Sequence, residues 1–136
     1  MHDSERRLLT DLRKTLLHLH KTLLDWERAA YERIHGRTSP GELLKVAMED
    51  PQFAWLRPIS ELIVRIDESL EMEAPDIPVD LDALVSRARA VVAPDEEGTP
   101  FARRYHTALQ DHPDAVFAHR DVTNILKSVP SRHTLH

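Results

Sequence analysis

One apolar stripe along the first 35 residues limits what this chain can fold into. Hydrophobic side chains recur there at alternating spacings of three and four, at Leu9, Leu12, Leu16, Leu19, Leu23, Trp26 and Ala30. This spacing is typical of one face of an α-helix. Gly36 follows, and glycine readily adopts the left-handed conformation that ends many helices. The pattern therefore predicts a helix from about Ser4 to His35, roughly 45 Å long at 1.5 Å per residue.

Polar side chains interrupt this stripe in a regular column. A second apolar column, formed by Leu17, Leu24 and Tyr31, widens the stripe. At about 100° per residue, the column between the two is Arg13, His20, Glu27 and Ile34. His20 and Glu27 are thus expected inside the apolar face, where an ionisable group is costly unless another element supplies a partner. For Glu27 the expected donors are a histidine, Arg57, or a residue from a second copy of the chain (Arg13 or His20).

The rest of the chain also reads as helices separated by prolines. Expected helices cover residues 40–49, 58–72 and 81–93, one opening at Pro100, and 113–129, with a short helical turn at 52–57. Two prolines favour an extended linker over 74–79, and 130–136 reads as a frayed tail. With 3 glycines in 136 residues, a turn-rich β fold is disfavoured. The prediction is an all-α single domain over 1–136, an antiparallel bundle of four principal helices and two short ones around a long N-terminal helix.

Composition excludes several classes of function. The formal net charge is -5 and no basic cluster stands out, so neither nucleic acid nor an anionic membrane surface is an expected partner. There is no cysteine, which excludes disulfides, thiolate metal sites and a cysteine nucleophile. No apolar run approaches the length of a membrane span. We therefore expect a cytoplasmic protein.

Two stretches in the first half of the chain resemble a protein family. They are AAYERIHG at 29–36 and FAWLRPISELIVRIDE at 53–68. Both are similar to sequences of a family of small bacterial helical proteins. The resemblance implies a compact helical bacterial protein. It implies no activity and assigns no functional residues.

A set of inward-facing polar residues is the most informative chemical constellation in the sequence. Helical periodicity places His20, Glu27, Asp67, His112 and His119 at or inside apolar faces. Of these, His20, Glu27, Asp67 and His119 form a ligand set for a divalent metal of the kind held in helical bundles. The same residues suit a general acid–base pair, or buried ion pairs that only fix helix register. No phosphate-binding glycine loop, nucleophile elbow or zinc motif is present, so no catalytic or cofactor-binding residue is predicted.

These observations favour a non-catalytic interaction or scaffold protein that forms a homodimer. The first helix is longer than the other helices would cover, and Val64 and Phe117 fall outside the apolar faces of their helices. A second copy of the chain would bury this uncovered apolar surface. The alternative is a helical bundle that binds a metal or small ligand through its inward-facing histidines and carboxylates.

Overall fold

The computed structural model describes residues 3–71 and 80–129. The predicted linker at 74–79 and tail at 130–136 lie outside these residues. Within them every regular element is helical, which confirms the all-α prediction. None of these helices is both long and apolar enough to cross a bilayer.

The helix bounds follow the proline and capping pattern closely. The elements are α1 (Asp3–His35), α2 (Pro40–Glu49), the 3₁₀ helix η1 (Pro51–Leu56), α3 (Arg57–Glu71), α4 (Leu81–Val91), α5 (Pro100–Asp111) and α6 (Pro113–Lys127). Gly36 has φ +85°, so it ends α1 in the predicted left-handed conformation. The last helix stops at Lys127, two residues before the predicted end.

Side-chain caps fix the starts of three helices. Ser39, Asp80 and Thr99 each accept a hydrogen bond from the backbone N–H three residues on, at 2.9 to 3.2 Å. Such a cap satisfies one of the free N–H groups in the first helical turn. Proline follows the cap in α2 and α5, where its missing N–H is harmless.

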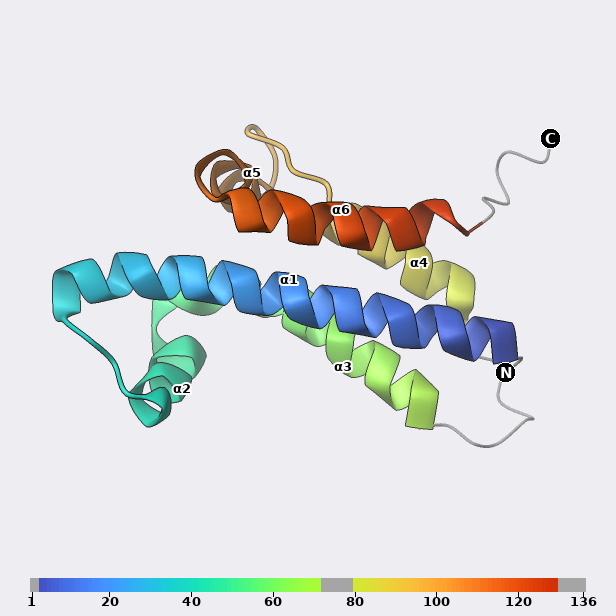
Figure 1. Ribbon diagram of the computed structural model, residues 1–136, viewed down its shortest axis with the longest axis horizontal. Coiled ribbons are helices and arrows are strands. Elements are labelled where there is room, and N and C mark those ends of the chain that lie inside the picture. The colour runs from blue at the N-terminus through green and yellow to red at the C-terminus, as the bar shows by residue number, and fades with distance from the viewer. Residues whose placement is uncertain (1–2, 72–79, 130–136) are drawn as a thin grey trace.

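α1 is the central element of the bundle (Figure 1). α3 and α6 pack along its two sides and run antiparallel to it, while α4 lies between α3 and α6. α5 closes the end of the bundle near the C-terminal half of α1, where it contacts η1 and α6. α2 lies on the other side of the same half of α1 and packs mainly on η1.

The predicted stripe forms the centre of the core. Its five leucines, Leu9, Leu12, Leu16, Leu19 and Leu23, have no exposed surface. Buried side chains from η1, α3, α4, α5 and α6 pack around them. α2 differs from every other helix because it contributes no buried side chain. It packs on the core only through partly buried side chains, namely Leu43, Val46 and Ala47.

Candidate functional site

The polar column of α1 bonds to other elements at three levels. Arg13 forms an ion pair with Asp67 on α3. One heptad later, His20 Nε2 lies 3.0 Å from the Ser60 hydroxyl, also on α3. One heptad further, Glu27 bonds to η1 and α5. The wheel prediction thus placed Arg13, His20 and Glu27 correctly, whereas Ile34, the last residue of the column, is 78% exposed.

Glu27 is the most deeply buried charged side chain in the described residues, with 1% of its surface exposed. Trp55 Nε1 donates to Glu27 Oε1 at 2.9 Å, and Arg104 donates to Glu27 Oε2 at 2.8 Å. The Arg104 guanidinium also lies 4.4 Å above the ring of Trp26. We call these four residues, Trp26, Glu27, Trp55 and Arg104, the Glu27 cluster. Each carboxylate oxygen has a donor, so the buried charge is compensated.

The expected donors for Glu27 were wrong. Within the described residues neither a histidine nor Arg57 reaches it, and no second copy is needed. Arg104 comes from α5, where it shares the apolar face of Phe101 and Tyr105. A cation at the border of an apolar helical face was the signal that could have identified Arg104. The hydrogen bond from Trp55 depends on how η1 turns, which the sequence pattern does not specify.

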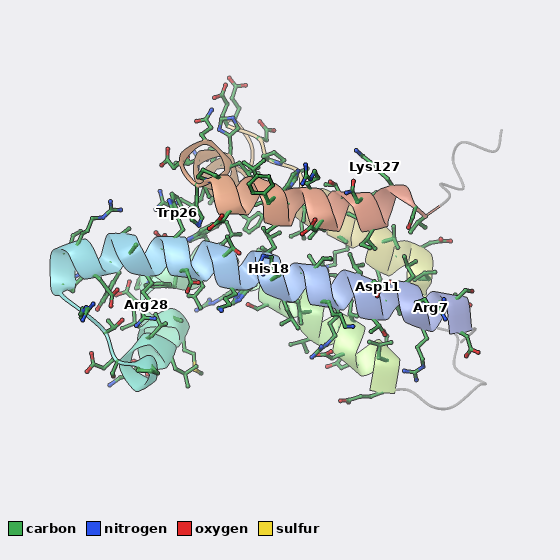
Figure 2. The ribbon with its side chains drawn as sticks, in the orientation of Figure 1. Arg7, Asp11, His18, Trp26, Arg28 and Lys127 are labelled. Carbon is green, nitrogen blue, oxygen red and sulfur yellow. The ribbon has the colours of Figure 1, made fainter. Side chains whose placement is uncertain are left out.

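Aromatic rings extend the Glu27 cluster into the core. Trp26 and Trp55 pack edge to face with centroids 6.3 Å apart. Trp55 contacts Phe101, and Phe101 stacks on Tyr105, each pair at 5.6 Å. Trp26 lies on the side of α1 toward α5 and α6 (Figure 2). These ring contacts hold α5 against the end of the bundle, so the role of the Glu27 cluster is structural.

Tyr105 and His119 form a second polar pair at the end of this aromatic row. The Tyr105 hydroxyl lies 2.5 Å from His119 Nδ1. Burial raises the pKa of Tyr105, so its phenol stays protonated and donates the hydrogen bond. Burial, and then the nearby charge of Lys127, lower the pKa of His119, so the ring accepts as a neutral imidazole.

The structure does not bring the predicted metal ligands together. His20 pairs with Ser60, Glu27 with Arg104, Asp67 with Arg13 and His119 with Tyr105. Within residues 3–71 and 80–129, no three histidine, aspartate or glutamate side chains are placed to hold a metal ion. The heptad spacing explains the separation, because residues seven apart lie on one face of α1 but about 10 Å apart along it. His112, the fifth inward candidate, is half-buried at the junction of α5 and α6.

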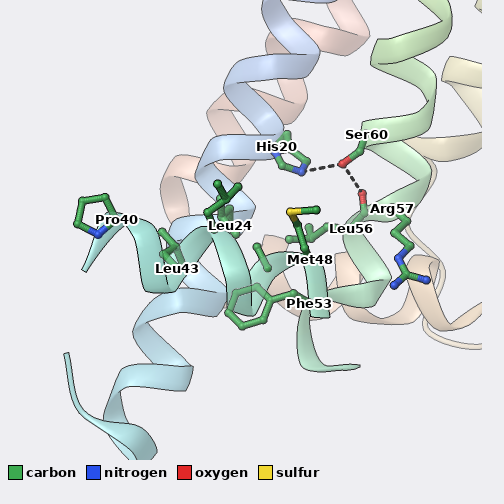
Figure 3. A pocket seen from close by; sticks show the side chains of 11 residues that line it. His20, Leu24, Pro40, Leu43, Met48, Phe53, Leu56, Arg57 and Ser60 are labelled. Carbon is green, nitrogen blue, oxygen red and sulfur yellow. Dashed lines mark hydrogen bonds between the residues drawn. The ribbon is translucent and has the colours of Figure 1, made fainter. Parts of the chain in front are cut away.

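A groove with mainly apolar walls lies beside α2. It has a volume of about 400 Å³ and lies between α1, α2, η1 and the start of α3 (Figure 3). Its apolar lining residues are Leu24, Pro40, Leu43, Leu44, Ala47, Met48, Phe53 and Leu56. His20, Arg57 and Ser60 supply its polar groups. Sequence reasoning missed this groove, since it depends on where α2 docks.

Hydrogen bonds in the loop before α2 also help to fix its position. Arg28 donates to the backbone carbonyl of Thr38 at 2.7 Å, and Arg28 lies on the side of α1 toward α2 (Figure 2). Glu32 accepts from both the backbone N–H and the hydroxyl of Thr38. These bonds, with a further contribution from Arg28, lower the pKa of Glu32. Together they fasten the loop while leaving the apolar side chains of α2 half-buried or exposed.

Among the three polar residues of the groove, only Arg57 carries a permanent charge. Burial lowers the pKa of His20, which favours the neutral ring. The Ser60 hydroxyl is 3.0 Å from His20 Nε2 and 3.5 Å from the carbonyl of Leu56. The contact with His20 is the shorter of the two, and the tautomer of the imidazole sets which group donates.

Comparison of the chain with family models, curated proteins and solved structures found no match.

Proposed function

We propose that this protein is a non-catalytic binding module that takes a small apolar ligand into the groove beside α2. The supporting observation is the groove itself, with about 400 Å³ of space and eight apolar residues among the eleven that line it. Ligand sites in proteins typically have this size and this mixture of apolar walls with a few polar groups. The lack of cysteine fits the reducing cytoplasm, where we propose that it acts.

The exposed apolar side chains of α2 support the same proposal. Leu44 and Met48 line the groove, yet 63% and 68% of their surfaces are exposed. A ligand between α2 and α1 would remove part of this apolar surface from water, which is worth about 25 cal/mol per Å². Because no side chain of α2 is buried, the helix can adjust its position at little cost to the core.

Titration with a neutral fluorescent probe, N-phenyl-1-naphthylamine, tests this function. We expect saturable binding at one probe per chain. The double variant Leu44→Glu/Met48→Glu should weaken binding by about tenfold or more, because charges would line the apolar wall. Phe117→Glu is the matched control, since Phe117 is similarly exposed but lies on α6. Equal binding by the double variant, or no binding by the native chain, would overturn the proposal.

Self-association is a second candidate, favoured by a further apolar strip beside the groove. Leu17 and Val64 are also exposed. Leu17 lies between Arg13 and His20 on α1, and Val64 lies between their respective partners on α3. Spacings of three and four place each on the same helical face as those bonded residues. The exposed strip therefore continues from α2 along the seam between α1 and α3, where a second copy would bury it in a homodimer.

Sedimentation velocity at micromolar concentration separates the two candidates. A homodimer through this strip should dissociate in the variant Val64→Glu, while Phe117→Glu should leave it intact. A strictly monomeric native chain would eliminate self-association and leave the ligand proposal standing. A dimer that persists in Val64→Glu would show that another surface forms it.

A further inference from the structure

We infer that the ligand of the groove is a free fatty-acid-type monocarboxylate, with its carboxylate held by Arg57 and its chain against α2 and η1. This inference rests on the proposed function and adds the chemistry of the head group. It is carried by the charge distribution around the groove.

Arg57 is a charge without a partner at the edge of an apolar site. It is exposed at the first position of α3. In the described part of the chain, its guanidinium has no hydrogen-bond or ion-pair partner. The carboxylate one turn along the same helix, Glu61, forms no ion pair with Arg57 in the described residues and lies 3.9 Å from Arg87 on α4. Arg57 is free to bind an anion from solution.

No charge opposes an anion inside the groove. The eleven lining residues include no aspartate or glutamate, and Arg57 is their one permanently charged member. The half-buried ring of His20 is favoured as neutral, as argued above. A cationic head group would meet only repulsion from Arg57. An anionic head group would gain a charge-assisted hydrogen bond in partly apolar surroundings.

The geometry gives the ligand a direction. Arg57 lies at one end of the lining residues and Pro40 at the other, with Leu24, Leu43 and Met48 between them (Figure 3). An alkyl chain would run from Arg57 toward Pro40 over this apolar stretch. Ser60 lies one helical turn after Arg57, so its hydroxyl can turn from His20 and donate to the carboxylate. A planar guanidinium suits a carboxylate because it can donate two parallel hydrogen bonds.

Calorimetric titration of the full chain with decanoate and with decan-1-ol tests this inference. The two probes share a chain and differ in the head group. We expect decanoate to bind about tenfold more tightly than the alcohol, the usual scale of one hydrogen bond to a charged group. Arg57→Gln should abolish this preference and leave the affinity for decan-1-ol unchanged. Arg65→Gln is the control, because Arg65 is an exposed arginine of the same helix outside the groove.

The outcomes separate the head-group inference from the proposed function. Equal binding of acid and alcohol would overturn the role of Arg57 while leaving an apolar binding groove. A preference for decanoate that persists in Arg57→Gln would likewise overturn it, and its loss in Arg65→Gln would show a general charge effect. Binding of neither probe would overturn both proposals. Circular dichroism of each variant confirms that it is folded.

Discussion

The Glu27 cluster and the groove are neighbours along α1, but the first buries a charge and the second exposes apolar side chains. In the Glu27 cluster a charge is almost fully buried, and each of its oxygens meets a donor. In the groove, large apolar side chains remain in contact with water. Buried polar groups that are fully bonded have little left to offer a ligand, whereas exposed apolar surface gains free energy when it is covered. The contrast indicates that the polar column is architecture and that the binding surface is apolar.

The largest expected effect comes from a charge placed in the core. Leu16 has no exposed surface, so Leu16→Asp would bury a carboxylate with no donor. Such a substitution costs several kcal/mol, comparable with the 5–15 kcal/mol that stabilises a typical domain. We expect the variant to be unfolded at 25 °C by circular dichroism. A folded variant would show that the core beside α1 is much looser than its burial indicates.

Substitutions in the Glu27 cluster should have the next largest effect. Glu27→Ala removes the acceptor of both Trp55 and Arg104 and should cost about 3 kcal/mol or more. Glu27→Gln keeps the shape and part of the hydrogen bonding, so it should cost less. Urea unfolding measures both. An alanine variant as stable as the native chain would contradict the architectural role assigned to the cluster.

The half-buried histidines His20 and His119 should make stability depend on pH. Burial lowers the pKa values of His20 and His119 from the ordinary 6.5. Below pH 6.5 the unfolded chain therefore takes up protons that the folded chain still excludes. Stability should be complete above pH 6.5 and fall as the pH drops below it, until the lowered pKa values are reached. His20→Gln should reduce the slope between pH 7 and 5 in urea unfolding, and an unchanged slope would show that His20 does not contribute.

The smallest expected effect comes from placing an acid in the groove instead of in the core. Met48→Glu also exchanges an apolar side chain for an acid, but 68% of Met48 is exposed. We expect the free energy of unfolding to change by no more than about 0.5 kcal/mol. Thermal unfolding in parallel with Leu16→Asp gives the measurement. A large loss of stability would mean that α2 is part of the core and not a surface for ligands.

Local sequence signals predicted the fold because proline, glycine and capping residues act on their own helices. Ser39, Asp80 and Thr99 mark helix starts wherever the helices later pack. The same periodicity showed that Glu27 faces inward. It could not identify Arg104 as the partner, because α1 and α5 meet through tertiary packing across 77 residues of sequence. The sequence could not predict the groove for the same reason, since residues of four elements form it.

The pairing of α1 with α6 has a consequence for synthesis on the ribosome. α1 ends at His35, and α6, with which it has its most extensive contact, begins only at Pro113. At 5–20 residues per second, translation takes on the order of 10 s to cover this interval. During that time the nascent chain carries a completed leucine stripe whose α6-facing side has no cover. That side is a surface on which chaperones can act before the bundle closes.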